Sequence, residues 1–168
     1  LRGVGPARFG AALDLGCGTG LCGPLVKPMV ERLDGVDLSP RMLDKARTLG
    51  VYDTLAQGDL VEHLRGIAQT YDLVLSADVL AYVGELEPVF AGVSRALNRG
   101  GVFCFSVERA DDDQSFALNV HQRYAHSEHY VRQLAQRHGF ETLKMLRHAI
   151  REDQREPIAG SYFYLAKA

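Results

Sequence analysis

Short apolar runs alternate with amphipathic segments along this chain, a pattern typical of strands that alternate with helices. The apolar runs predict strands at residues 11–15, 32–38, 52–57, 71–77 and 102–107. Helical spacing of apolar positions predicts helices at residues 21–30, 40–48, 60–67, 86–97 and 127–138. This order predicts an α/β fold, with a mostly parallel sheet and helices on both faces.

The last part of the chain departs from this alternation. Residues 108–125 are predicted as a polar connection. Two late strands, at 140–151 and 160–166, leave little room for a helix between them. Strands joined so closely pair antiparallel, so the sheet should end on an antiparallel strand.

Proline residues mark the bounds of two helices. Pro40 follows Ser39, which predicts an N-cap at Ser39 and a first helical residue at Pro40. Pro28 cannot sit comfortably inside a helix, so the segment 21–30 should be short or distorted.

Composition indicates one globular domain. The chain has 168 residues, of which 46% are hydrophobic and 24% charged, and its net charge of −2 gives no strong field toward nucleic acid or membrane. Cys17, Cys22 and Cys104 lack zinc-ribbon spacing and predict free thiols in a reducing compartment, so a cytoplasmic location is expected. No signal peptide is visible, and no apolar run approaches the 18 or so residues that could span a membrane. The chain begins at Leu1, and we expect a single domain that lacks N-terminal segments of a longer protein.

Three alternating glycines, Gly16, Gly18 and Gly20, follow the first strand and open the first helix. Glycine tolerates positive φ and lets a ligand approach the backbone, and this context indicates nucleotide-type binding. A dinucleotide fingerprint also fits by letter from Gly18 to Gly23, but it starts two residues late, and the sixth position counted from Gly16 is Leu21. A nicotinamide oxidoreductase is therefore the weaker alternative.

Three acidic residues accompany this loop. Asp14 lies inside the first strand, where its charge would repel a pyrophosphate and suits a ligand that carries an ammonium group. Asp37 closes the second strand, where a carboxylate can accept hydrogen bonds from both ribose hydroxyls, and Asp59 ends the third, where it can accept from an adenine amino group. Asp37 and Asp59 are also ordinary turn residues. Together, at the carboxyl ends of successive strands, the three acids predict a nucleoside ligand.

The chain resembles the class I S-adenosylmethionine-dependent methyltransferases in segments 14–20, 35–43, 57–59 and 71–74, and in the Gly100-Gly101 pair. The resemblance implies a Rossmann-like sheet of seven strands whose last strand is antiparallel. A further likeness, in segments 124–130, 139–141 and 151–160, is to bacterial methyltransferases joined to tetratricopeptide repeats.

The resemblance also implies the cofactor, S-adenosyl-L-methionine, its product S-adenosyl-L-homocysteine, and the residues that hold it. The loop backbone would face the methionine part, at Gly16, Cys17, Gly18 and Gly20, and Asp14 would approach its ammonium group, directly or through water. Asp37 would hold the ribose, with Leu38 and Met42 flanking the adenine. Gly58, Asp59 and Leu60 would meet the adenine edge, and Ala77 and Asp78 the methionine end and the methyl group.

Methyl transfer is an in-line displacement that depends mainly on alignment and exclusion of water, so no fixed catalytic triad is expected. Acceptor contacts are predicted at Tyr82, His121, Tyr124, His126 and Arg151. Of these, His126, Tyr82 and Tyr124 are the candidate catalytic residues. For His126 the reason is that the unperturbed pKa of a histidine suits a general base.

Other ligand classes are disfavoured. The spacing of His121, His126 and His129 and the run Asp111–Asp113 fit solvated surfaces better than a metal site. The sequence has no strip of basic residues interleaved with aromatic ones, which is the pattern that would suggest RNA binding. A small molecule is the expected methyl acceptor, and a protein acceptor is left open, because appended repeats would offer a binding surface. A non-enzymatic cofactor-binding or scaffold domain is the alternative from another class. The sequence does not predict the oligomeric state.

Overall fold

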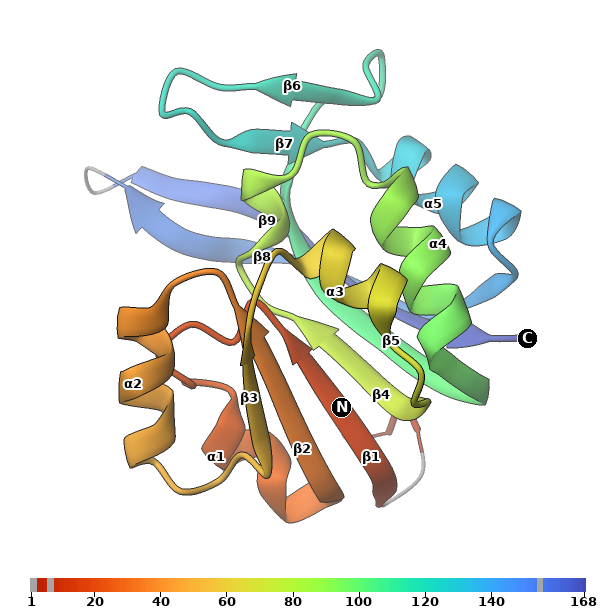
Figure 1. The fold of residues 1–168 in the computed structure, drawn as a ribbon. Coiled ribbons are helices and arrows are strands. Elements are labelled where there is room, and N and C mark those ends of the chain that lie inside the picture. The colour runs from red at the N-terminus through yellow and green to blue at the C-terminus, as the bar shows by residue number, and fades with distance from the viewer. Residues whose placement is uncertain (1–2, 6–7, 154–155) are drawn as a thin grey trace.

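The computed structural model describes residues 3–5, 8–153 and 156–168 and has one mixed sheet at its centre (Figure 1). Five strands run parallel in the order β3-β2-β1-β4-β5: β1 (Phe9–Leu15), β2 (Val30–Asp37), β3 (Thr54–Gln57), β4 (Tyr71–Ser76) and β5 (Leu97–Arg109). Strand β9 (Glu156–Lys167) then pairs antiparallel with β5, and β8 (Phe140–Asp153) pairs antiparallel with β9. The predicted fold class is confirmed, including the antiparallel last strand, but the described residues form a sheet of nine strands and not the seven that were expected.

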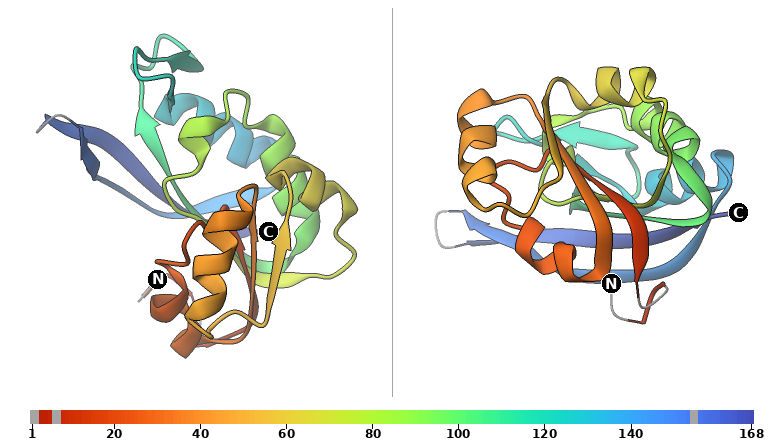
Figure 2. Two further views of the ribbon diagram at one scale, coloured as in Figure 1. Left: turned by 60° about the vertical axis from the view of Figure 1, so that its left-hand side comes forward. Right: turned by 60° about the horizontal axis from the view of Figure 1, so that its bottom comes forward.

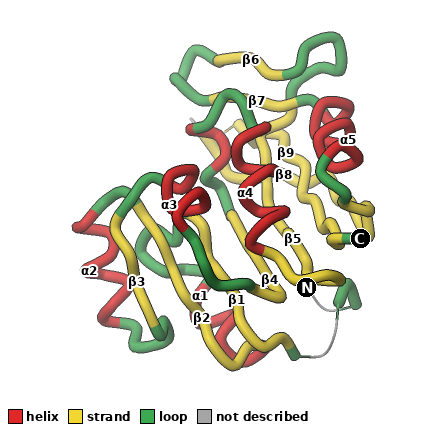
Figure 3. Tube along the Cα trace, turned by 45° about the vertical axis from the view of Figure 1, so that its right-hand side comes forward, coloured by secondary structure: helices red, strands yellow, loops and turns green. Residues whose placement is uncertain are grey.

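Helices cover both faces of this sheet. Helix α1 (Gly23–Val26), the 3-10 turn η1 (Lys27–Met29) and α2 (Pro40–Thr48) lie on one face. The opposite face carries α3 (Leu60–Gly66), α4 (Glu87–Ala96) and α5 (Glu128–Arg137), which stand in front of the strands in Figure 3 while α1 lies behind them.

Local signals account for the helix bounds. The Ser39 hydroxyl accepts a hydrogen bond from the Met42 N–H at 3.4 Å, which confirms the predicted N-cap of α2. The segment predicted to be distorted is a single α-helical turn that continues as the 3-10 turn η1, which contains Pro28. Proline has no N–H to donate to the preceding turn, which explains the break.

The segment 108–125, predicted only as a polar connection, also contains two short strands that were not predicted. A hairpin of β6 (Phe116–Leu118) and β7 (Tyr124–His126) lies there, and β7 pairs parallel with the end of β5 at Glu108 and Arg109. Three-residue strands are too short to show alternation of apolar and polar residues, so the pattern concealed them. Figure 2 shows the hairpin extending beyond the main sheet.

The larger hydrophobic core lies between the sheet and α3, α4 and α5. At its centre the Phe90 ring stands edge-on to Phe103, Phe105 and Phe140, with ring centroids 5.6–6.0 Å apart. A smaller core on the other face includes Leu33 and Leu73. This packing fixes the carboxyl ends of β1, β2, β3 and β4 along one edge of the sheet.

Two further observations concern the chain as a whole. Within the described ranges, no helix is both long and apolar enough to cross a membrane. Of the segment 151–160 used in the likeness to repeat-linked methyltransferases, residues 154–155 lie outside the described residues.

Candidate functional site

The glycine loop, residues 16–22, connects β1 to α1 at the carboxyl end of the sheet. Gly16, Gly18 and Gly20 have φ of +70°, +54° and +86°, which side chains rarely adopt. A Cβ atom on Gly16 or Gly20 would also lie within 2.5 or 2.8 Å of a neighbouring side chain. At Gly18 the nearest atom would be Met42 Sδ at 3.8 Å. The backbone at Gly18 therefore has the open space that a ligand needs.

Asp37, at the end of β2, is held in place by this loop. Its Oδ2 accepts a hydrogen bond from the Gly18 N–H at 2.9 Å, and its Oδ1 accepts one from the Ser39 N–H at 2.8 Å. Each carboxylate oxygen keeps a further lone pair, so the fixed carboxylate can accept from two adjacent hydroxyl groups. This arrangement fits a ribose.

Exposed apolar side chains lie beside Asp37. Leu38 is 69% exposed and Met42 is 45% exposed. Leu38 follows β2 directly, and Met42 lies in the first turn of α2 next to Gly18. Apolar groups left open to water beside a carboxylate that could bind ribose suit a flat base such as adenine.

Asp59 caps helix α3 at the neighbouring strand end. One oxygen, Oδ1, accepts hydrogen bonds from the N–H groups of Val61 and Glu62, at 2.9 and 3.0 Å. The Gly58 N–H donates to the Asp37 carbonyl at 3.1 Å, which ties the ends of β2 and β3 together. A Cβ atom on Gly58 would meet nothing within 4 Å. The exposed side chain of Asp59 keeps acceptor capacity for an amino group of a ligand.

Asp14 lies beneath the glycine loop and is only 2% exposed. Its Oδ2 accepts a hydrogen bond of 2.7 Å from the Tyr52 hydroxyl. Burial raises the pKa of Asp14 to about 6, while the Tyr52 hydrogen bond lowers it and the charge of Asp37 raises it. An ammonium group over the loop would favour the charged carboxylate. Because Asp14 is so enclosed, contact through water fits better than direct contact.

A charged cluster lies beyond the ends of β4 and β5. Asp78 has a positive φ of 55°, and its N–H donates to Ser106 Oγ at 2.9 Å. Its carboxylate pairs with Arg151 of β8 at 2.7 Å, and Arg151 also pairs with the buried Glu108 of β5. Strained backbone of this kind costs about 1–3 kcal/mol and tends to occur at functional sites. The cluster holds Asp78 where the sequence predicted the methyl end of the site.

Of the predicted acceptor residues, Arg151 lies at this cluster and Tyr82 is near it. The Tyr82 ring is 63% exposed and lies under the Arg123 guanidinium, 5.0 Å from the ring centroid. The Tyr124 ring packs against Phe116. His121 lies in the exposed β6–β7 turn, with its N–H on Asn119 Oδ1.

His126 is not placed to act as a base. Its ring is fully buried, its Nε2 lies 2.8 Å from the Gly84 carbonyl, and burial lowers its pKa. A general base must reach the proton it removes, and this imidazole has no open path to an acceptor. The prediction of a catalytic His126 is corrected on this ground: the side chain anchors the hairpin to the loop after η2 (Leu80–Tyr82).

No metal-binding cluster is found in the part of the chain that the structure describes, where no three His, Cys, Asp or Glu side chains converge. His126 is buried, whereas His129 is exposed and its N–H lies 3.3 Å from Asp112 Oδ1. The expectation of a solvated surface therefore fits His121 and His129 but not the buried His126.

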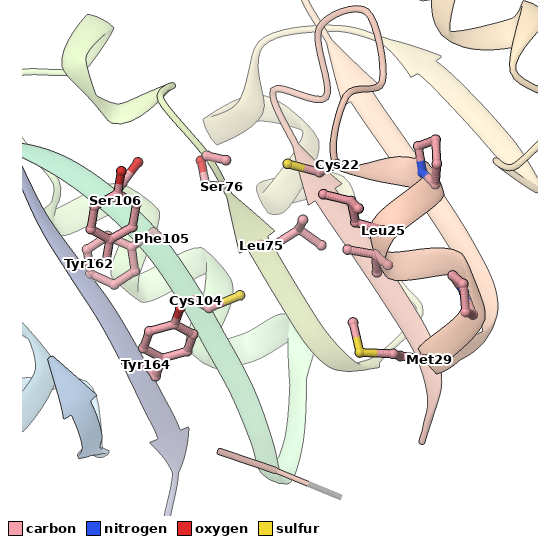
Figure 4. Close-up of a pocket in the computed structure, with 14 residues that line it drawn as sticks. Cys22, Leu25, Met29, Leu75, Ser76, Cys104, Phe105, Ser106, Tyr162 and Tyr164 are labelled. Atoms are coloured by element: carbon pink, nitrogen blue, oxygen red, sulfur yellow. The ribbon is translucent and has the colours of Figure 1, made fainter. Parts of the chain in front are cut away.

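A pocket of about 580 Å³ opens beside Ala77, on the face of the sheet that carries α1 (Figure 4). Leu25 and Met29 form one wall, and Tyr162 and Tyr164 of β9 form the other. Leu75 of β4 lies between these walls. Among the described residues, the side chains that line the space are uncharged, and its volume is in the usual range for small-molecule sites.

Sequence reasoning missed Tyr52, Glu108 and Ser106. Tyr52 was predicted only as part of a strand, although the structure turns its ring toward the glycine loop. Glu108 and Ser106 lie on β5 or at its end, and only the pairing of that strand with its neighbours brings them to Asp78 and Arg151. No local sequence signal could have identified these contacts.

The fold and the site together define the class I S-adenosylmethionine-dependent methyltransferases, and comparisons with known proteins agree. A family model described as "Methyltransferase domain" matches residues 13–105. Malonyl-[acyl-carrier protein] O-methyltransferase of Hamiltonella defensa is 32% identical over 106 residues, which are 63% of this chain and 41% of that protein. Ubiquinone biosynthesis O-methyltransferase of Methylocella silvestris is 31% identical over 111 residues, covering 64% of this chain and 43% of that protein.

Solved structures share the fold. The N-methyltransferase NodS of Bradyrhizobium japonicum WM9, in complex with S-adenosyl-L-homocysteine, has a TM-score of 0.76 at 19% identity. That match covers 95% of this chain and 79% of the NodS chain. The chain belongs to the methyltransferase domain family. It spans less than half the length of the curated relatives named above.

Proposed function

We propose that this chain binds S-adenosyl-L-methionine at the glycine loop and transfers its methyl group to a small-molecule acceptor. The observation that carries the proposal is the fixed carboxylate of Asp37 at the carboxyl end of β2, beside the open backbone of Gly18. Ligands of open α/β sheets bind at this edge. The S-adenosyl-L-homocysteine in the NodS complex supports the choice of cofactor.

Each part of the cofactor has matching residues in this proposal. Asp37 accepts from the ribose hydroxyls, and Leu38 and Met42 flank the adenine. Asp59 accepts from the adenine amino group, next to Gly58 and Leu60. Asp14 provides the negative charge for the ammonium group, beneath the loop backbone of Gly16, Cys17, Gly18 and Gly20. The methyl end lies toward Ala77 and Asp78.

The bound cofactor would supply a methyl group on a positively charged sulfur, which is a reactive electrophile. The chain would contribute alignment and exclusion of water, since in-line displacement needs a nucleophile held opposite the leaving group. Orientation of this kind contributes roughly 7–11 kcal/mol in favourable intramolecular models. No residue of the described chain is assigned as an obligatory base.

The acceptor would enter the pocket beside Ala77. Because uncharged side chains line that space, the buried part of the acceptor should be neutral and largely apolar. Two relatives are O-methyltransferases by name, which makes hydroxyl and carboxyl acceptors the first to screen.

The Asp37→Ala variant tests the cofactor site. Loss of a charged hydrogen-bond partner should weaken S-adenosyl-L-homocysteine binding by about 1–3 kcal/mol, measured by titration calorimetry. Asp44→Ala is the matched control, because Asp44 lies on α2 with its side chain 71% exposed and pairs with Arg47 of the same helix. An Asp37→Ala protein that is folded and binds as tightly as the wild type would refute the assignment.

A further inference from the structure

A pair formed by the half-buried Tyr52 and the buried carboxylate of Asp14 lies under the glycine loop. The Tyr52 hydroxyl donates to Asp14 Oδ2 at 2.7 Å, and the two residues come from different parts of the fold. Asp14 is on β1, whereas Tyr52 lies in the connection between α2 and β3. Tyr52 was not among the predicted site residues.

Three glycines make room for the Tyr52 ring. A Cβ atom on Gly20, Gly23 or Gly35 would lie 3.0, 2.8 or 3.0 Å from a ring carbon of Tyr52. These glycines lie in the loop, at the start of α1 and in β2. Because the ring fills a space enclosed by three backbone segments, its hydroxyl has little freedom to leave Asp14.

We propose that Tyr52 is a positioning residue for cofactor binding, which holds the Asp14 carboxylate in its ionised form beneath the glycine loop. The inference rests on the proposed function, because it assumes that the ammonium group of the cofactor lies over this loop. A phenol that donates a hydrogen bond stabilises a carboxylate more than the neutral acid. The other surroundings of Asp14 favour its neutral acid form or leave its charge without compensation.

The other titratable groups around Asp14 disfavour its charge or stay neutral. Asp37, on β2, raises the pKa of Asp14 by its negative charge. The thiols of Cys17, Cys22 and Cys104 have pKa values raised by burial to about 12, 11 and 12, so they stay protonated near neutral pH. Among these neighbours only Tyr52 favours the ionised form, and even so burial raises the pKa of Asp14 to about 6.

Tyr52→Phe removes the hydroxyl and keeps the ring that the three glycines surround. If loss of the hydrogen bond raises the pKa of Asp14 by about one, the ionised fraction at pH 6 falls from about a half to about a tenth. S-adenosyl-L-homocysteine should then bind about fivefold more weakly at pH 6. At pH 8 Asp14 is ionised in both proteins, so the two affinities should be nearly equal.

Tyr71→Phe is the matched control. The Tyr71 hydroxyl donates to the buried Asp34 at 3.0 Å, on a different part of β2 and β4. This variant loses the same chemical group from another tyrosine–aspartate pair, whose two members are both buried, and its binding should follow the wild-type pH profile.

The inference is tested by calorimetric titrations with S-adenosyl-L-homocysteine from pH 5.5 to 8. The proteins compared are wild type, Tyr52→Phe, Tyr71→Phe and Asp14→Asn. A Tyr52→Phe profile displaced to higher pH supports the inference, and so does the absence of a pH dependence in Asp14→Asn. A Tyr52→Phe profile that follows the wild type, or a loss that is equal at pH 6 and pH 8, would overturn the inference alone. A folded wild type that does not bind S-adenosyl-L-homocysteine would overturn the proposed function as well.

The carboxyl ¹³C resonance of Asp14 gives a second measurement on the wild-type protein, which needs no variant to fold. Its apparent pKa should fall when S-adenosyl-L-homocysteine is added. An unchanged pKa in the complex would contradict the role assigned to the pair.

Discussion

Asp14 has a destabilising charge in the free protein that a bound cation would compensate. The carboxylate is almost fully buried, and Tyr52 donates the hydrogen bond that partly offsets this burial. Nearby, Asp37 is held rigid by two backbone N–H groups before any ligand arrives. At the scale of single residues, the site is organised for a ligand that carries a positive charge and a pair of hydroxyls.

The Asp14→Asn variant should be more stable than the wild type at neutral pH. The pKa of Asp14 is raised on folding from 3.8 to about 6, mainly by burial. Between these values the folded state binds more protons than the unfolded state, so this residue lowers stability as pH rises from about 4 to 6. Above that range the difference between the two proteins should reach on the order of 3 kcal/mol.

Urea unfolding between pH 4 and pH 7 measures this difference. The exposed control Asp44→Asn should stay close to the wild type at every pH. If the difference in unfolding free energy between Asp14→Asn and wild type does not change with pH, folding does not raise the pKa of Asp14 as the structure indicates.

Individual residues differ in how far the sequence could identify them. Asp37 and Asp59 were predicted as site residues because each follows a recognisable strand, and parallel strands bring their carboxyl ends to one edge. The role of Tyr52 could not be predicted, because its ring packs against three glycines that are distant from it in the sequence.

Among the elements, the starts of two helices have local sequence signals, whereas the short strands have none. Ser39 and Ser127 cap α2 and α5 through their hydroxyls, so the starts of these helices could be predicted from sequence. The hairpin β6–β7 could not, because two three-residue strands are specified by packing of Phe116 and Tyr124 rather than by pattern. That hairpin borders the proposed acceptor end of the site through Glu108, which accepts a hydrogen bond from Asn119 at 3.0 Å.

The contact between α3 and α4 gives a test at this scale. A Cβ atom on Gly92 of α4 would lie 2.7 Å from the Leu64 Cβ of α3, which cannot move without its backbone. Alanine has a higher helix propensity than glycine by about 1 kcal/mol, but overpacking costs about 1–3 kcal/mol. Gly92→Ala should therefore lower the free energy of unfolding by about 1 kcal/mol.

Gly66→Ala is the matched control, because a Cβ atom at the end of α3 would meet nothing within 4 Å. Thermal unfolding should show a lower midpoint for Gly92→Ala and an unchanged or higher midpoint for Gly66→Ala. Equal shifts in the two variants would show that packing between the helices is looser than the structure indicates.

At the scale of the whole molecule, the order of the strands brings the candidate site together. Strands β3, β2, β1 and β4 are adjacent, so Asp59, Asp37, the glycine loop and Asp78 follow one another along a single edge. Insertion of β9 beside β5 carries Tyr162 and Tyr164 to the pocket next to that edge. The sheet class was predictable from alternating patterns, but the register that aligns these residues depends on pairing between distant strands.

Calorimetric titration of the wild-type protein with S-adenosyl-L-homocysteine, and separately with NAD⁺, tests the central claim most directly. The account predicts one binding site for S-adenosyl-L-homocysteine and no binding of NAD⁺, since Asp14 opposes a pyrophosphate at the loop. Binding of NAD⁺ by the folded protein, or no binding of S-adenosyl-L-homocysteine, would contradict it.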